Sequence, residues 1–176
     1  EGITLLCNQS EYYKGMHFVG ATLWTDFDNA DQAKMAEAGR VMNDYHCIMM
    51  DRVITTQMSE DIVVEPITPQ NTLNEHRLTA SWLKQVLPTL NGDVFVFTHH
   101  APSKASAISG YNTSVNFAYA SDLTDLIRQN PNVKYWAHGH IHENNSYHIG
   151  MCNVISNPRG YCDWGENTKF DPDMRI

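Results

Sequence analysis

The chain has 176 residues, of which 42% are hydrophobic and 18% charged, with a formal net charge of −8. This composition is typical of one globular domain over residues 1–176 and excludes a disordered chain. The negative charge argues against broad electrostatic capture of nucleic acid or an anionic membrane, so nucleic acid is expected only as a substrate at bound metal ions. No apolar run approaches the roughly 20 residues that span a bilayer. The four cysteines form no C-x-x-C pair and indicate reduced thiols in a cytoplasmic protein.

The first elements expected along the chain are two short strands. Ile3–Leu6 and Met16–Trp24 are apolar runs, and the polar stretch Asn8–Gly15 between them predicts a turn. Gly20 interrupts the second run and indicates a bulge or a close backbone contact.

A helix and a loop are expected next. Asn29–Asn43 predicts a helix, and Asp28 ahead of it is more simply a helix start signal than a metal or substrate group. Asp51–Pro66 shows no clear periodicity and predicts a loop beside the functional pocket.

A second helix is expected from Thr68 to about Leu87. Thr68 is a good N-cap and Pro69 suits the first helical position. Its apolar residues recur at spacings that indicate one core-facing stripe: Leu78, Trp82, Leu83 and Val86. His76 on this helix is expected to lie at the surface or half-buried.

Two strands buried on both faces are expected in the second half of the chain. Val94–Phe97 is an unbroken apolar run, and Val133–Ala137 is a mostly apolar run. Ser103–Asn116, rich in small residues, predicts either a substrate-gating loop or a solvated connector.

The remaining elements are a helix, a hairpin and a tail. Ser121–Gln129 predicts a helix capped by Ser121, with Leu123, Leu126 and Ile127 facing inward. Ser146–Ile149 and Cys152–Ser156 predict a hairpin. The tail from Tyr161 is expected to be mostly loop, with a short edge strand at its end.

Histidines follow both of the buried strands. His99 and His100 come after the first, and His138, His140 and His142 come at two-residue spacing at the end of the second. Because ligands gather at the carboxyl ends of strands in α/β sheets, the two strand ends predict one histidine-lined pocket. Neutral imidazole is a common metal ligand, so a metal site is expected there.

The sequence resembles a known family at these motifs. THHAP (98–102) and GHIHE (139–143) resemble the second half of the calcineurin-like metallophosphoesterases, as do VGATLWTDF (19–27), MNDYHCI (42–48) and SNPRGY (156–161). The resemblance implies an α/β fold that is the C-terminal half of a four-layer α-β-β-α sandwich, with mixed sheets flanked by helices. It implies hydrolysis of a phosphate mono- or diester by a metal-bound hydroxide at a dinuclear site.

The motifs of that family's first half do not occur in the sequence. D-x-H, G-D-x-x-D and G-N-H followed by Asp or Glu are all missing. We therefore expect an amino-terminal segment, from the same protein or another chain, to supply them, and we expect residues 1–176 alone not to be active. The charge of a dinuclear metal site leads to the same expectation. Neutral histidines leave the positive charge of two divalent cations uncompensated, so a bridging carboxylate is needed.

The resemblance also implies roles for individual residues. His99 and His140 would bind the second metal ion and His142 the first, the ions being Mn²⁺, iron, Zn²⁺ or Mg²⁺. His100 and His138 would contact the phosphate or orient neighbouring groups. Arg159 would contact a phosphate oxygen or be a structural arginine beside a turn.

Two alternatives remain open from the sequence. One is a mononuclear zinc hydrolase in which His99, His140 and His142 bind a single ion, which needs no missing half. The other is a degenerate scaffold or interaction subunit that has kept the fold and lost the carboxylates.

Overall fold

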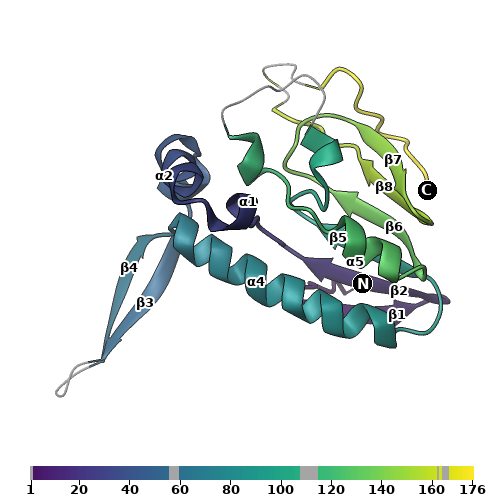
Figure 1. Cartoon of the computed structure of the whole chain (residues 1–176), viewed down its shortest axis with the longest axis horizontal. Coiled ribbons are helices and arrows are strands. Elements are labelled where there is room, and N and C mark those ends of the chain that lie inside the picture. Colours follow the sequence, from purple (N-terminus) through teal and green to yellow (C-terminus); the bar gives the residue numbers. More distant parts are fainter. Residues whose placement is uncertain (1, 56–59, 108–114, 162, 164–166) are drawn as a thin grey trace.

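A computed structural model describes residues 2–55, 60–107, 115–161, 163 and 167–176 (Figure 1). Its centre is a six-stranded mixed sheet in the order β1-β2-β5-β6-β8-β7. The strands are β1 (Gln9–Tyr13), β2 (Met16–Ala21), β5 (Val94–Thr98), β6 (Val133–His138), β7 (Asn145–Ile149) and β8 (Cys152–Ser156). The four central strands are parallel, and β1 and β7 are antiparallel edge strands. The α/β class and the mixed sheet that the sequence analysis predicted are confirmed.

The first hairpin differs from the expected one. The prediction of a strand over Ile3–Leu6 is wrong, and β1 occupies most of the stretch assigned to a turn. Lys14 and Gly15 connect β1 to β2 with φ angles of 48° and 89°. Two consecutive positive φ angles make a type I′ hairpin turn, whose twist matches the two strands. The register is thus set by the turn and not by the apolar residues.

Gly20 in β2 allows a close backbone contact, as predicted. A Cβ atom there would overlap the Cβ of Leu6 and lie 3.0 Å from the Leu6 carbonyl oxygen. The segment before β1 therefore crosses the sheet closely at this residue.

Two helices cover one face of the sheet, α4 (Pro69–Val86) and α5 (Thr124–Gln129) (Figure 1). The buried core lies between these helices and the sheet and includes Val19, Leu83, Val96, Leu126, Ile127, Trp136 and Val154. The inward residues expected of α5 are buried, but Ser121 does not cap it. The Ser121 hydroxyl instead accepts a hydrogen bond from the backbone N–H of Asp26 at 3.0 Å.

Helix α4 begins as expected. The Thr68 hydroxyl accepts from the backbone N–H of Asn71, the Asn71 side chain accepts from that of Thr68, and Pro69 is the first helical residue. These reciprocal contacts form a capping box. The expected stripe is only partly right, since Leu83 is fully buried but Leu78 is 61% exposed. A 3₁₀ turn, η1 (Leu87–Thr89), follows the helix.

His76 on α4 is buried, which corrects the expectation of a surface or half-buried side chain. It is 6% exposed, and its Nδ1 lies 3.2 Å from the carbonyl oxygen of Leu23. The carbonyl can only accept, so Nδ1 donates this hydrogen bond.

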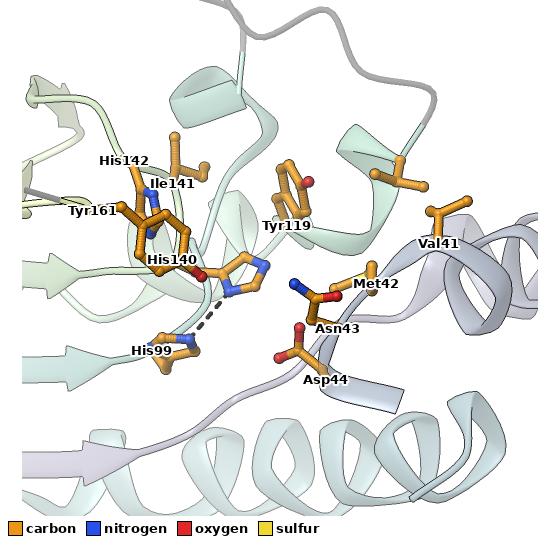
Figure 2. A pocket seen from close by; sticks show the side chains of 11 residues that line it. Val41, Met42, Asn43, Asp44, His99, Tyr119, His140, Ile141, His142 and Tyr161 are labelled. Atoms are coloured by element: carbon orange, nitrogen blue, oxygen red, sulfur yellow. Dashed lines mark hydrogen bonds between the residues drawn. The ribbon is translucent and has the colours of Figure 1, made fainter. Parts of the chain in front are cut away.

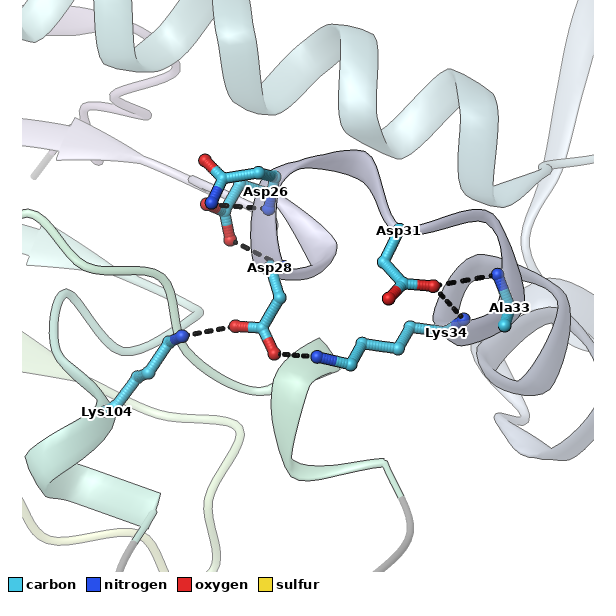
Figure 3. Close-up of polar contacts among 7 residues, drawn as sticks. Asp26, Asp28, Asp31, Ala33, Lys34 and Lys104 are labelled. Atoms are coloured by element: carbon cyan, nitrogen blue, oxygen red, sulfur yellow. Dashed lines mark hydrogen bonds and ion pairs between the residues drawn. The ribbon is translucent and has the colours of Figure 1, made fainter.

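The helix expected over 29–43 forms over most of that range as α2 (Gln32–Val41). A separate turn, α1 (Phe27–Ala30), precedes it, and a short helix, α3 (Asp44–Cys47), follows it. The residues of α1 have φ angles from 50° to 65°, so this turn is left-handed. Asp31 separates it from α2, and its carboxylate caps α2 by accepting from the N–H groups of Ala33 and Lys34 (Figure 3). The break follows from this change of hand, because a left-handed turn cannot continue into a right-handed helix.

Asp28, within the left-handed turn, forms ion pairs with Lys34 and Lys104 (Figure 3). The hydrogen bond from Lys104 and then the one from Lys34 lower the pKa of the Asp28 carboxyl. This carboxylate joins α2 to the segment that follows the THHAP motif.

The prediction of a loop over Asp51–Pro66 is wrong for residues 51–55 and 60–66, which belong to the antiparallel pair β3 (Met49–Thr55) and β4 (Glu60–Pro66). This pair projects away from the main sheet (Figure 1). Val53, Ile62 and Val64 on it are 60%, 69% and 59% exposed. An exposed pair of strands has no buried face, so no alternation of apolar residues marks it in the sequence.

The other segments agree with the sequence analysis in part. The hairpin β7–β8 forms as predicted. Residues 108–114 of the expected gating loop lie outside the described residues, and the flanking parts form η2 (Lys104–Ala107) and η3 (Asn116–Ala118). The described part of the tail contains no strand. Among the described helices, none is long and apolar enough to cross a bilayer.

The second face of the sheet carries a row of aromatic rings. Phe18, Phe95 and Tyr135 lie side by side on β2, β5 and β6, and Phe97 stacks on Phe95 with ring centroids 4.1 Å apart. Phe97 is 39% exposed, so the prediction that β5 is buried on both faces is wrong at this residue.

Candidate functional site

A pocket of about 380 Å³ opens at the carboxyl ends of β5 and β6 (Figure 2). Its described lining comes from five regions of the chain: Val41, Met42, Asn43, Asp44, His99, Val115, Tyr119, His140, Ile141, His142 and Tyr161. The sheet topology explains this place, since β5 and β6 are parallel neighbours that both end here.

The three histidines predicted to bind metal line this one pocket. The Nε2 of His99 lies 3.1 Å from the Nδ1 of His140, and Figure 2 shows these two nitrogens pointing toward each other. His142 lies further along the wall, with its ring 4.9 Å from that of Tyr161. His99 and His140 thus lie on the same side of the sheet, as a shared metal site requires.

His140 is held in an unusual backbone turn. Its φ angle is 60°, and the N–H of Ile141 donates to the carbonyl of Gly139 at 2.7 Å. A bond from residue i+2 to residue i around a positive φ makes a γ-turn of the rare, strained type. The N–H of Gly139 also donates to the carbonyl of His99 at 3.0 Å, which ties the two histidine motifs together.

Two of the pocket histidines, His99 and His140, have lowered pKa values and are therefore neutral near neutral pH. Burial is the largest cause that lowers the pKa of His140 to about 3, with further contributions from His99, His142 and His138. Burial also lowers the pKa of His99, while the negative charge of Asp44 acts in the opposite direction. Neutral imidazole is the form that binds metal ions.

Sequence reasoning missed Asp44 and Asn43 as members of the site. Asn43 directly precedes α3 and Asp44 begins it, and both side chains point into the pocket across from His99 and His140 (Figure 2). The stretch MNDYHCI carried the resemblance, but nothing in its pattern placed a carboxylate near His99. That position depends on how α2 and α3 pack beside the end of β5.

The other three candidate residues are not among the described residues that line the pocket. His100 is fully buried beneath His140, with ring centroids 4.4 Å apart, and burial keeps its pKa well below the usual value. Its Nδ1 lies 3.4 Å from the carbonyl of Thr22, and its Nε2 has no hydrogen-bond partner.

His138 and Arg159 take different positions. His138 is 6% exposed, with Nε2 2.9 Å from the Ser106 hydroxyl and Nδ1 3.0 Å from the Gly139 carbonyl. Arg159 is exposed on the segment after β8. The placement of His138 suits a group that orients its neighbours.

The donor set fits a metal ion in part. Ligand nitrogens lie about 2.0–2.1 Å from zinc, so two on one ion are about 2.9–3.4 Å apart for angles of 90° to 109°. The 3.1 Å between His99 and His140 falls in this range. Within the described ranges, however, no group of three or more His, Cys, Asp or Glu side chains is arranged to hold a metal ion. The histidine pair therefore offers two positions, and other donors are needed to complete a site.

Comparisons of the chain with models of known protein families, with curated proteins and with solved structures found no match.

Proposed function

We propose that this chain provides histidine ligands of a metal-dependent phosphoesterase that acts on phosphate mono- or diesters. The observation that carries the proposal is the 3.1 Å separation of His99 Nε2 and His140 Nδ1 at the ends of two parallel strands. In this proposal both bind the second of two divalent ions and His142 binds the first. When bound, the ions supply Lewis acidity and activate a water molecule at neutral pH.

The pocket residues would prepare the site before an ion binds. Burial disfavours protonation of His99 and His140, so their lone pairs are available to an ion near neutral pH. Asp44 places a negative charge on the opposite wall, which favours a cation between the two walls. The γ-turn fixes the direction of the His140 ring, which reduces the ordering needed on binding.

A complete site in this proposal requires donors from another segment. An amino-terminal segment of the same protein, or another chain, would supply the carboxylates and cover the aromatic face of the sheet with a second sheet. That arrangement would be the four-layer α-β-β-α sandwich. The exposure of Phe97 supports this part, because a second sheet packed there would remove an apolar side chain, 39% exposed, from water.

The mononuclear zinc alternative has less support. His142 lies against Tyr161, and no group of three ligating side chains is assembled among the described residues. The scaffold alternative predicts that neither metal binding nor hydrolysis depends on the histidine pair.

The proposal is tested on the protein together with the amino-terminal segment or partner chain that supplies the carboxylates, with bis(p-nitrophenyl) phosphate and p-nitrophenyl phosphate in the presence of Mn²⁺. We expect turnover that needs the metal ion and that falls by at least about 100-fold in His140→Ala, because the ion loses a ligand. His148→Ala is the matched control, since this histidine is exposed on β7. Metal-dependent turnover that is equal in all three proteins would overturn the proposal.

A further inference from the structure

Three side chains behind the His140 turn form a chain of hydrogen bonds. The Oγ of Ser106, in η2, lies 2.9 Å from Nε2 of His138 and 2.7 Å from the hydroxyl of Tyr147 on β7. Ser106 is 1% exposed and His138 is 6% exposed. The chain joins the segment after the THHAP motif to the end of β6 and the middle of β7, and Ser106, His138 and Tyr147 are not among the described residues that line the pocket.

The direction of each hydrogen bond follows from one carbonyl group. Nδ1 of His138 lies 3.0 Å from the carbonyl oxygen of Gly139, which can only accept, so Nδ1 carries the hydrogen. In a neutral imidazole the other nitrogen, Nε2, then holds the lone pair. Ser106 must therefore donate to Nε2, and Tyr147 must donate to Ser106. The hydroxyl of Tyr147 is also hydrogen-bonded to Ser103.

The far end of the chain reaches the backbone of the γ-turn. The carbonyl of Gly139 accepts both the His138 ring N–H and the N–H of Ile141 that closes the turn around His140. A positive φ at a residue other than glycine persists only when its surroundings hold it. The His138 ring is thus one of the groups that fix the carbonyl on which this turn depends.

We propose that Ser106 and Tyr147 are positioning residues that act through His138. Their hydrogen bonds stabilise the Nδ1–H tautomer of His138. The N–H of this ring then donates to the Gly139 carbonyl and fixes its direction. The γ-turn built on that carbonyl keeps Nδ1 of His140 facing Nε2 of His99. The role of this relay in metal binding rests on the proposed function; the hydrogen-bond directions do not.

A nucleophilic serine is the rival explanation, because a serine that donates to a histidine is also the arrangement of a Ser–His catalytic pair. A nucleophile must be reached by its substrate. Ser106 is 1% exposed and is not among the described residues that line the pocket. A positioning role therefore fits the burial better.

The first test reads the ring directly, by long-range ¹H–¹⁵N spectra of the metal-free protein. We expect His138 as the Nδ1–H tautomer, with its Nε2 resonance moved downfield in Ser106→Ala as the hydrogen bond is lost. Tyr147→Phe should move the resonance less. Ser121→Ala, which removes an equally buried hydroxyl that bonds Asp26, should leave it unchanged. An Nε2–H tautomer, or a resonance that does not respond to Ser106→Ala, would overturn the relay.

The second test is the affinity for Co²⁺ by calorimetric titration. We expect Ser106→Ala to weaken binding about tenfold or more, as groups that orient metal ligands do, while Ser121→Ala binds as the wild type does. Unchanged affinity in Ser106→Ala would overturn the relay and leave the proposed function intact. A wild-type protein that binds no Co²⁺ would overturn the proposed function, and the nitrogen spectra would still decide the relay. Labelling of Ser106 by a fluorophosphonate would show the nucleophilic role instead.

Discussion

The indole Nε1 of Trp136 donates to the hydroxyl oxygen of Thr98 at 2.9 Å, and that hydroxyl donates to the carbonyl of His100 at 2.7 Å. Trp136 is fully buried in β6, and Thr98 is the last residue of β5. One hydroxyl therefore links the carboxyl-terminal parts of β5 and β6, which the pocket histidines follow.

Thr98→Val should lower the free energy of unfolding by about 1–3 kcal/mol, because it leaves the buried indole N–H and the His100 carbonyl without this partner at nearly constant shape. Urea denaturation monitored by Trp fluorescence measures the change. Thr89→Val is the control, since that exposed hydroxyl donates only to the carbonyl of Val86 and should change stability by less than about 0.5 kcal/mol. Equal losses in the two variants would mean that the Trp136–Thr98 contact adds little.

The left-handed turn of α1 predicts that replacing alanine by glycine changes the free energy of unfolding in opposite directions at Ala30 and Ala33. Ala30 has a φ angle of 62°, a conformation that disfavours L-residues by roughly 1–2 kcal/mol but not glycine. Ala30→Gly should therefore raise the unfolding free energy by about 0.5–1 kcal/mol once the greater flexibility of glycine in the unfolded chain is subtracted. Ala33→Gly, at an exposed site in the right-handed α2, should lower it by about 1 kcal/mol. Destabilisation by both substitutions would contradict a left-handed α1.

Stability should fall as the solution is acidified, and His76 should contribute to this loss. Burial is the largest cause that lowers the pKa of His76 below 6.5 in the folded protein. On acidification the unfolded chain binds the proton first, so the contribution is complete above about pH 6.5 and is lost as the pH falls toward the folded pKa.

Urea denaturation at pH 7.5 and pH 5.5 measures this difference. His76→Gln should reduce the loss of stability between the two pH values, whereas His148→Gln at an exposed position should not. Four other histidines, His99, His100, His138 and His140, also have lowered pKa values and act in the same direction. A loss that is unchanged in His76→Gln would contradict the burial of its ring.

The central strands could be predicted because burial marks them. Val94–Phe97 is a continuous apolar run and Val133–Ala137 is mostly apolar, and both form parallel strands. The convergence of their histidines followed from topology alone. Helix α4 was equally clear, since its N-cap threonine and first-turn proline are local signals.

Elements without a buried face could not be found in this way. The β3–β4 pair has exposed apolar residues on its strands, and β1 is a polar edge strand that is set by its turn. Asp44 was not predicted as a site residue for a related reason, since its position relative to His99 depends on tertiary packing between segments far apart in sequence. The burial of His76 likewise depends on the carbonyl of Leu23 across the core.

A cobalt(II) titration followed by visible absorption tests the central claim, that His99 and His140 share one metal ion, most directly. The account predicts that wild-type protein gives ligand-field bands, that His99→Ala and His140→Ala each weaken binding by more than about 100-fold, and that His148→Ala binds as the wild type does. The expected loss exceeds the 10–100-fold that follows removal of groups which merely orient ligands. Equal affinity in the wild type and both pocket variants, or no binding by the wild type, would contradict the account.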